Sequence, residues 1–325
     1  MRATAKAHTN IALIKYWGKR NEELILPTNS SLSVTLDGFY TRTTVHFKNE
    51  LQKDVFTLND KVIKDIAYER VTNYLELFRN YANKQGLYAE VNSINKVPTA
   101  AGFASSASGF AALAAATAQA LKLDLSEQEL SKFTRQGSGS ACRSIYGGFV
   151  EWQKGQANDG SDSYAIQIAP QDHWDIRVAA VVLTAKEKDV SSRVGMKRTV
   201  DTSVFYDGWL DSLPADLEAI KEGIVAKDFE KVGSIAEANC LKMHATTLGA
   251  VPPFTYWQDT TMTVMQTVQS LRKSGFPAYF TIDAGPNVKV LYLPKDEQEV
   301  LKKLRQTDGV TDVIVSKVGE GISYV

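Results

Sequence analysis

The order of apolar and polar residues predicts strands over most of the first half of the chain. Alternating or β-branched runs of strand length lie at residues 11–15, 32–36, 43–47, 55–58, 88–92, 148–152, 164–168 and 176–183. The segment Leu58-Asn59-Asp60-Lys61 is typical of a hairpin turn. We therefore expect the first half to be built around a sheet.

Apolar residues at three- and four-residue spacing predict helices. Val71, Tyr74, Leu75 and Phe78 repeat in this way, which indicates a helix at 66–83 packed against the sheet. Further helices are predicted at 106–121, from a Ser126 and Glu129 capping box to about Gly137, and at 213–225, 229–241, 255–274 and 297–306. Strands are expected on both sides of a turn at 283–286 and at 313–316, so the second half reads as an α+β lobe.

The length and composition of the chain predict a globular protein of two lobes. A chain of 325 residues exceeds the size of one small domain, and 44% hydrophobic with 23% charged residues is the balance of a protein with a sizeable core. The pattern changes after Thr184. We place the two lobes at 1–183 and 184–325.

The charge balance argues against binding to nucleic acid or to a membrane surface. Lysine plus arginine and aspartate plus glutamate both total 37, so any anion site must be a local cluster. The apolar stretches at 11–14 and 110–120 are too short to span a bilayer. Cys142 and Cys240 lie far apart in a chain with no secretory leader, so we expect free thiols and a cytoplasmic location.

The four histidines give no indication of a metal site. His8, His46, His173 and His244 have no mutual spacing that would build a zinc site.

A turn of small residues followed by a helix, Pro98-Thr99-Ala100-Ala101-Gly102-Phe103-Ala104-Ser105-Ser106-Ala107, is a candidate phosphate site. Unpaired N–H groups and the helix dipole at a helix start favour an anion. The hydroxyls of Ser105, Ser106 and Ser108 can donate to phosphate or help to hold Mg²⁺. On the residues alone, a plain helix cap with alanine packing is an equal interpretation. The loop lacks the Gly-Lys-Ser/Thr ending of a Walker A motif.

This loop resembles the ATP loop of the GHMP kinase superfamily, except that Phe103 stands where the kinases usually have leucine. The longer string PTAAGFASSASGFAAL is similar to the diphosphomevalonate decarboxylase branch. Three further segments share this resemblance: NIALIKYWGK at 10–19, GSGSACRS at 137–144 and DAGPN at 283–287. The match extends in order over nearly the whole chain.

The resemblance implies an α+β fold of two GHMP-type lobes, an N-terminal ATP-binding lobe like ribosomal protein S5 domain 2 and a C-terminal α/β sandwich, with the active site between them. It implies ATP-dependent decarboxylation of mevalonate 5-diphosphate to isopentenyl diphosphate, with release of ADP, phosphate and CO₂. ATP and Mg²⁺ are the implied cofactors, with Mg²⁺ held mainly by the ATP phosphates. A homodimer is common in the family.

Asp283 and Arg143 are the principal catalytic candidates. Asp283 follows the apolar run 278–282 and can project from a strand end as the general base for the C3 hydroxyl. On its own, an aspartate before Gly-Pro favours a simple turn, and the resemblance reverses this. Arg143 lies in an open Gly-Ser stretch, where a guanidinium can bind the substrate carboxylate in a bidentate manner and keep Asp283 ionised.

The remaining candidates belong to the substrate. Ser138 and Ser140 are expected to donate to the diphosphate or carboxylate. The resemblance implies that Tyr16 and Lys19 contact the diphosphate, that Lys19 also takes part in catalysis, and that Asn10 supports Arg143. Without the resemblance, Lys15 and Lys19 would be interpreted as solvated surface charges.

The segment 186–198 holds five basic residues and is the expected local cluster. Ser191 or Ser192 can cap a short helix facing phosphate, and Arg193 can pair with the diphosphate; a charged surface loop is the alternative. The predicted ATP-binding residues are Pro98, Ala101, Gly102, Ala104, Ser105, Ser106, Ser108, Lys188 and Met196.

Two other functions compete with decarboxylation. The same fold serves a mevalonate 3-kinase or a phosphomevalonate decarboxylase, whose substrate has one phosphate fewer. A nucleotide-binding regulatory protein without turnover is a second alternative, but such a protein needs no general base. The presence of both Asp283 and Arg143 favours the enzyme.

Overall fold

The computed structural model describes residues 1–97, 105–183 and 189–325. Five of the predicted ATP-binding residues lie outside this described part of the chain: Pro98, Ala101, Gly102, Ala104 and Lys188.

The first half of the chain forms the predicted sheet, with eight strands in the described residues. Its strands are β1 (Arg2–Ile14), β4 (Ser31–Lys48), β5 (Val55–Leu58), β6 (Lys61–Ile63), β7 (Tyr88–Asn95), β8 (Phe149–Trp152), β9 (Ala165–Ala169) and β14 (Ser323–Tyr324). The order is β14-β1-β4-β7-β5-β6, while β8 pairs with the start of β4 and with β9. The Leu58–Lys61 hairpin is confirmed, because Asn59 and Asp60 both adopt the positive φ that such a turn requires.

Two strands predicted at 32–36 and 43–47 are one continuous strand, β4. The exposed residues Asp37 and Gly38 interrupt the apolar pattern there without interrupting the extended backbone. Likewise β1 begins at Arg2, nine residues before the predicted start. Its first residues alternate small and polar side chains, and such a pattern does not stand out as a strand.

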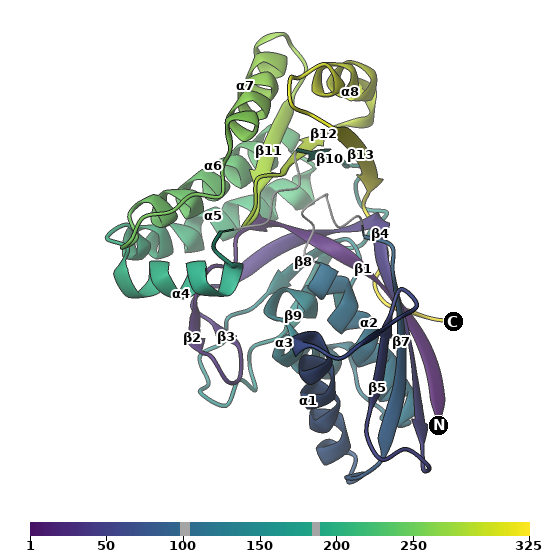
Figure 1. The fold of residues 1–325 in the computed structure, drawn as a ribbon. Helices are drawn as coiled ribbons and strands as arrows, with labels where there is room; N and C mark the ends of the chain where they lie inside the picture. The colour runs from purple at the N-terminus through teal and green to yellow at the C-terminus, as the bar shows by residue number, and fades with distance from the viewer. Residues whose placement is uncertain (98–104, 184–188) are drawn as a thin grey trace.

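Three helices lie on one face of this sheet: α1 (Ile66–Tyr81), α2 (Ser105–Ala120) and α3 (Glu127–Gly137) (Figure 1). The alanines of α2 allow its backbone to lie close against β1 and β4, and Ala111 to Ala116 are buried. The predicted Ser126 and Glu129 capping box is confirmed at the start of α3. The 3₁₀ helix η2 (Gly139–Ile145) follows α3.

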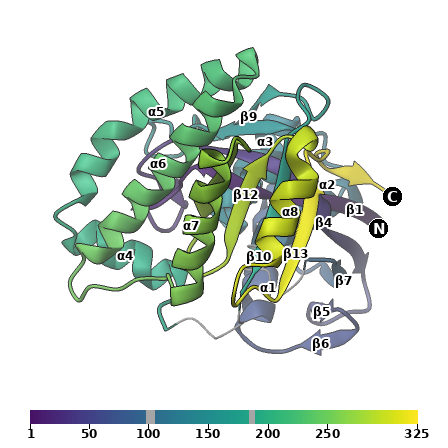
Figure 2. The same cartoon turned by 90° about the horizontal axis from the view of Figure 1, so that it is seen from above.

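The second lobe is built on an antiparallel sheet of order β11-β12-β10-β13. These strands are β10 (Arg177–Val182), β11 (Ala278–Ile282), β12 (Val288–Tyr292) and β13 (Asp312–Lys317). Its helices are α4 (Ser192–Thr202), α5 (Tyr206–Ala226), α6 (Phe229–Leu248), α7 (Asp259–Lys273), the 3₁₀ helix η3 (Pro294–Asp296) and α8 (Glu297–Arg305) (Figure 2). A small hairpin of β2 (Lys19–Asn21) and β3 (Leu26–Pro27) completes the described fold.

Helix α5 is longer than predicted. It starts at Tyr206 and contains Pro214, whereas the sequence pattern placed its start at Leu213. Tyr206, Trp209 and Leu213 form its buried face at helical spacing, so tertiary packing extends the helix on the N-terminal side of the proline.

One apolar cluster crosses between the lobes. It joins Ile11 of β1 and Leu32 of β4 to Val178 of β10, Ile220 of α5 and Phe229 of α6. Two strands also belong to the sheet on the other side of the predicted division between residues 183 and 184. Strand β10 belongs to the second sheet, and β14 returns to pair with β1 in the first.

Both cysteines are buried and free, as predicted. Along the described ranges, the model has no helix with enough length and apolar character to cross a bilayer.

A buried ion pair fixes α1 to the sheet. The guanidinium of Arg79 contacts both carboxylate oxygens of Asp54 at 2.9–3.1 Å, and the N–H of Ala89 donates to Asp54 at 2.8 Å. Both side chains are 1% exposed. The pair therefore sets the position of a helix that also carries a side chain into the cleft described below.

We predict that Asp54→Ala lowers the free energy of unfolding by about 3–5 kcal/mol, because it leaves a buried guanidinium without its partner. Urea unfolding followed by circular dichroism measures the loss. Glu76→Gln is the matched control, since Glu76 is the exposed partner of the same Arg79; it should cost less than about 1 kcal/mol. Equal stability of the two variants would contradict the prediction.

Candidate active site

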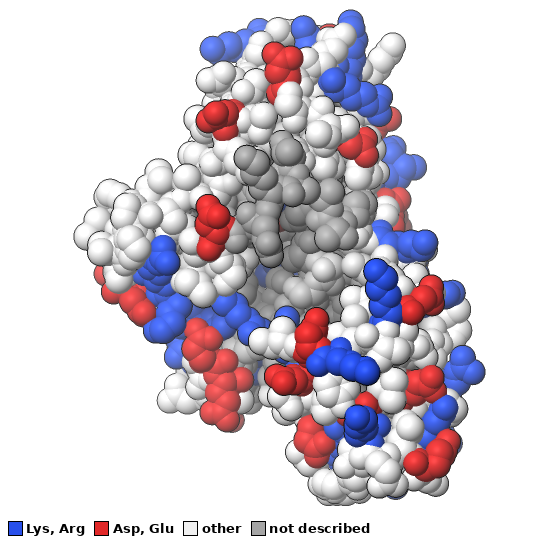
Figure 3. Space-filling view, viewed as in Figure 1, with Lys and Arg blue, Asp and Glu red and all other residues white. Residues whose placement is uncertain are grey.

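A cleft of about 720 Å³ lies where the first sheet meets the second lobe. Basic side chains gather beside the hollow, while charges of both signs cover the rest of this face (Figure 3). Thirteen predicted site residues line the cleft: Asn10, Tyr16, Lys19, Ser105, Ser106, Ser138, Ser140, Arg143, Ser191, Ser192, Arg193, Met196 and Asp283. The fold thus brings five distant segments of the chain together, and the ligand contacts of these residues stay predictions.

Ser108 is not brought to the cleft. Its hydroxyl lies 2.8 Å from that of Thr41 and is fully buried against the sheet. Ser106 and Ser108 are separated by about 200° around the axis of α2, so they face opposite sides of the helix. The hydroxyl of Ser108 is therefore engaged by a side chain of the sheet.

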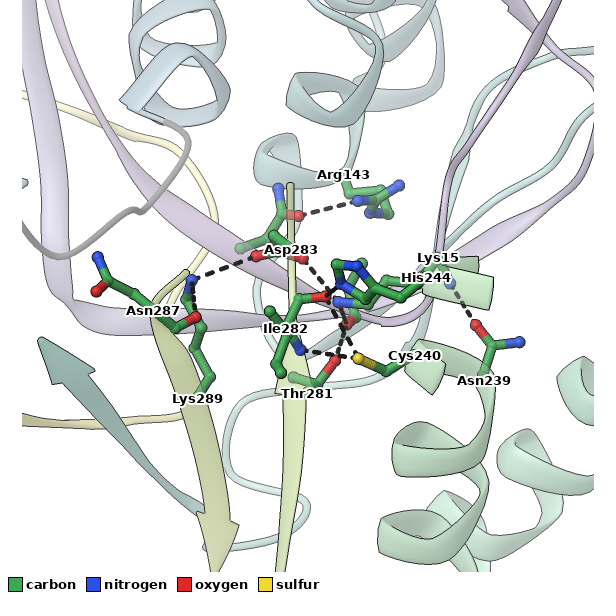
Figure 4. Close-up of polar contacts among 12 residues, drawn as sticks. Lys15, Arg143, Asn239, Cys240, His244, Thr281, Ile282, Asp283, Asn287 and Lys289 are labelled. Carbon is green, nitrogen blue, oxygen red and sulfur yellow. Dashed lines mark hydrogen bonds and ion pairs between the residues drawn. The ribbon is translucent and has the colours of Figure 1, made fainter. Parts of the chain in front are cut away.

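Asp283 projects from the end of β11 and lies between two lysines (Figure 4). Lys15 Nζ is 2.7 Å from its Oδ1 atom, and Lys289 Nζ is 3.8 Å from its Oδ2 atom. Burial alone would raise the pKa of Asp283, but the charges of Lys15 and Lys289 and the hydrogen bond from Lys15 outweigh it and hold the pKa well below its usual value. Asp283 is therefore ionised at neutral pH.

Lys15 is not the solvated surface charge that its sequence suggested. It is 2% exposed, and its ammonium group also donates to the carbonyl of Ala12 at 3.0 Å. Its backbone is held on both sides: its N–H donates to Asn239 Oδ1 at 2.9 Å, and its carbonyl accepts from Asn29 Nδ2 at 2.8 Å. Sequence reasoning assigned no role at the site to Lys15 or Lys289, because lysine is usually exposed.

Arg143 is buried on η2, and three side chains orient its guanidinium. It donates to Ser33 at 2.9 Å, to Ser31 at 2.5 Å and to Asn10 at 3.2 Å. A guanidinium carries five N–H donors, so the bonds seen among the described residues leave two for a ligand. Burial lowers the pKa of Arg143, but a guanidinium keeps its charge in proteins. Lys15 and Lys289 form the direct ion pairs with Asp283, and the charge of Arg143 also interacts with that carboxylate.

Asn10 makes the predicted contact with Arg143. Its amide group also donates to the carbonyl of Ser140 at 3.0 Å and to the hydroxyl of Ser144 at 2.8 Å. The end of β1 and the Gly-Ser stretch are therefore fixed to each other by one side chain.

The hydroxyl of Tyr16 lies at the cleft. Its ring packs against Trp152 with centroids 4.7 Å apart, and burial raises the pKa of the phenol. Within the described residues the hydroxyl oxygen is buried and makes no hydrogen bond, although Tyr16 lines the cleft. A polar ligand in the cleft would satisfy it. Lys19, nearby, pairs with Glu22.

Helix α4 presents its N-terminus to the cleft. Ser191, not Ser192, is the N-cap, because its hydroxyl accepts from the N–H of Val194 at 3.3 Å. Arg193 lies in the first turn. Arg70 of α1 also lines the cleft and was not predicted; it lies over the ring of Phe110 at 5.0 Å. Burial and the charge of Arg193 lower the pKa of Arg70, and an anion bound near these two guanidiniums would relieve their repulsion.

The histidine beside Asp283 is His244, which is buried. Burial and the charge of Lys15 lower the pKa of His244, beside Asp283, to about 3, so it is neutral at pH 7. Among the described residues no three His, Cys, Asp or Glu side chains are placed to hold a metal ion.

Comparisons with known proteins agree with this geometry. Residues 7–165 match a family described as the diphosphomevalonate decarboxylase-like N-terminal domain, and residues 178–313 match the mevalonate 5-diphosphate decarboxylase C-terminal domain. The diphosphomevalonate decarboxylase of Ganoderma lucidum is 42% identical over 93% of this chain and 80% of its own length.

Solved structures agree over the whole chain. Mevalonate diphosphate decarboxylase from Staphylococcus aureus superposes with a TM-score of 0.95 at 47% identity and covers 100% of this chain and 98% of that one. MDDEF in complex with MVAPP, AMPPCP and magnesium superposes with a TM-score of 0.93 at 50% identity and covers 100% and 99%. The expected two-lobed α+β fold is confirmed, and the chain belongs to the diphosphomevalonate decarboxylase family.

Proposed function

We propose that this protein catalyses the ATP-dependent decarboxylation of mevalonate 5-diphosphate to isopentenyl diphosphate, with release of ADP, phosphate and CO₂, as a step of isoprenoid biosynthesis. The observation that carries the proposal is an ionised carboxylate, Asp283, in the same cleft as the oriented guanidinium of Arg143. The names of the relatives, and the MVAPP and AMPPCP in the structure of MDDEF, support this reaction over a 3-kinase or a phosphomevalonate decarboxylase.

The first step requires a proton acceptor at the C3 hydroxyl. ATP with Mg²⁺ supplies the phosphoryl group that turns this poor leaving group into phosphate. Because the pKa of Asp283 is lowered, the carboxylate is a weak base for an unreacted alcohol. Asp283 therefore accepts a hydrogen bond that orients the hydroxyl, and it takes the proton as the oxygen–phosphorus bond forms and acidifies it.

The second step loses phosphate and CO₂. The C3–O bond breaks with its electrons on the phosphate, and the pair of the carboxylate C–C bond becomes the new double bond. The two remaining N–H groups of Arg143 bind the substrate carboxylate and hold that C–C bond in place, while Ser138 and Ser140 donate to the carboxylate or diphosphate.

The diphosphate of the substrate occupies the basic side of the cleft. Tyr16, Lys19, Ser191, Ser192 and Arg193 are its proposed ligands. Lys19 leaves Glu22 to reach it, and the hydroxyl of Tyr16, which has no hydrogen-bond partner among the described residues, gains one.

ATP binds through Ser105, Ser106, Met196 and the predicted residues outside the described ranges, in a cleft between an N-terminal ATP-binding lobe and a C-terminal lobe. Arg70, opposite Arg193, adds positive charge near the phosphates.

We further propose that the protein works as a homodimer in the cytoplasm, which the family resemblance supports. Light scattering of the purified protein tests the dimer.

The proposal is tested by giving the protein ATP, Mg²⁺ and mevalonate 5-diphosphate and measuring CO₂, ADP and phosphate together. Equimolar release of all three supports it. ADP without CO₂ indicates a 3-kinase, preference for mevalonate 5-phosphate indicates a phosphomevalonate decarboxylase, and no ADP at all favours a regulatory nucleotide-binding protein.

We predict that Asp283→Ala lowers kcat by about 10²- to 10⁴-fold or more, because the hydroxyl loses its proton acceptor. Binding of mevalonate 5-diphosphate, measured by titration calorimetry, should remain close to that of the wild type. A variant that keeps a wild-type kcat would show that Asp283 is not the base.

Arg143→Lys is predicted to lower kcat strongly although the charge is kept, because an ammonium group cannot reproduce the planar fork that bonds Ser31, Ser33 and Asn10. Arg135→Lys is the matched control: Arg135 is equally buried but donates to backbone carbonyls outside the cleft. The control should lose thermal stability and retain kcat. Near-normal kinetics for Arg143→Lys would contradict bidentate binding of the substrate carboxylate by Arg143.

Lys15→Met should move the acid limb of the pH profile of kcat/KM to higher pH. Activity requires ionised Asp283 and falls as pH falls through its pKa; without Lys15, burial of the carboxyl is opposed mainly by Lys289, so that pKa rises. Lys289→Met should shift the limb in the same direction but less, since it lies 3.8 Å away instead of 2.7 Å. A Lys15→Met profile that superimposes on the wild-type profile would contradict the assignment.

A further inference from the structure

The proposed diphosphate ligands come from two separate pieces of the chain. Tyr16 and Lys19 lie after the end of β1, and Ser191, Ser192 and Arg193 lie at the N-terminus of α4. These pieces belong to different halves of the fold. A diphosphate can bind both only if their separation is fixed to within a hydrogen-bond length.

Trp17 joins the two pieces through its indole N–H. This group donates to the hydroxyl of Thr199 at 2.7 Å, and both side chains are buried. The single proton of the Thr199 hydroxyl is shared between the carbonyls of Gly195, at 3.0 Å, and Met196, at 2.9 Å, in the first turns of α4. The chain of hydrogen bonds therefore runs from the residue between Tyr16 and Lys19 directly into the helix that carries Arg193.

The ring of Trp17 makes a second connection to the same helix. It packs edge-on against Tyr256, with centroids 6.2 Å apart, and the Tyr256 hydroxyl donates to the carbonyl of the N-cap Ser191 at 3.4 Å. The Tyr206 hydroxyl of α5 fixes the backbone of Trp17 by donating to its carbonyl at 2.8 Å. Trp17 therefore connects to α4 at two places: at Thr199 directly, and at the N-cap Ser191 through Tyr256.

The backbone beside Trp17 is also shaped for this contact. Gly18 has φ of +124°, and a Cβ atom there would lie 1.8 Å from the Tyr206 hydroxyl. A side chain at this position would collide with Tyr206, and only glycine adopts this positive φ without strain. The close approach of Tyr206 to the backbone therefore requires glycine next to Trp17.

We propose that Trp17 is a positioning residue, which through Thr199 and Tyr256 sets the distance between the two halves of the diphosphate subsite. This inference rests on the proposed function for the identity of the ligand. It does not make Trp17 a group that reacts; the indole acts through α4 on the placement of Ser191, Ser192 and Arg193.

The test uses Trp17→Phe, which keeps an aromatic ring and removes the N–H, and Thr199→Val, which keeps the shape and removes the hydroxyl. Each should raise KM for mevalonate 5-diphosphate about tenfold, the effect of one lost buried hydrogen bond, with kcat changed less than about twofold. The double variant should be no worse than either single variant, because both changes break the same bond.

Trp209→Phe is the matched control. It removes another buried indole N–H, one that has no hydrogen-bond partner among the described residues. This variant should leave KM unchanged. A similar rise in KM in the control, or additive effects in the double variant, would overturn the positioning role.

Amide hydrogen exchange of residues 192–202 in the ligand-free protein separates this inference from the proposed function. Exchange should be faster in Trp17→Phe and Thr199→Val, and unchanged in Trp209→Phe. Unchanged exchange in the first two variants refutes the coupling. If the two variants exchange faster but the wild-type protein releases no CO₂, the proposed function is refuted and the coupling stands. If the two variants exchange faster but their KM is unchanged, the link to diphosphate binding is refuted.

Discussion

The partly buried ion pair between Lys15 and Asp283 is the interaction around which the site is arranged. It joins the end of β1 in the first sheet to the end of β11 in the second, so both sheets must be in place for this pair to form and for the charge of Lys15 to be compensated by Asp283. Because an isolated buried charge is costly, this requirement ties the assembly of the two halves to the protonation state of the catalytic carboxylate. Asn239 and Asn29 bond to the backbone of Lys15, and the second cation, Lys289, lies beside Asp283.

The apolar cluster shared by the two halves has a mechanical consequence. Residues of β1 and β4 pack with α5 and α6 in one continuous core, so rotating the halves apart as rigid bodies would expose that core to water. Separating the halves would therefore cost apolar burial, whereas moving elements outside the cluster would not. This rigidity suits a reaction in which a carboxylate, a guanidinium and a diphosphate site must keep fixed distances.

The sequence was informative where residues act locally and uninformative where they act across the fold. Periodicity and capping predicted α1, α3 and the Leu58–Lys61 hairpin, because these depend on neighbouring residues. Motif resemblance located Asp283, Arg143 and the serines of the cleft. Neither source assigned a role to Lys15, Lys289 or Arg70, since the burial and charge partners of these side chains come from segments far away in the chain. The contact of Ser108 with Thr41 was also not predicted, because the direction of a helical side chain is fixed by the surface against which the helix packs.

Strand β10 lies between β12 and β13 in the second sheet, although it precedes them in the chain by the whole of α4 to α7. A fragment that began after residue 183 would lack the strand that holds its sheet together, and β12 and β13 would each present an unpaired edge. The half that carries Asp283 is therefore not a module that evolution or a protein engineer can move to another chain as one contiguous piece. It has to be inherited together with the segment that leads out of the first half.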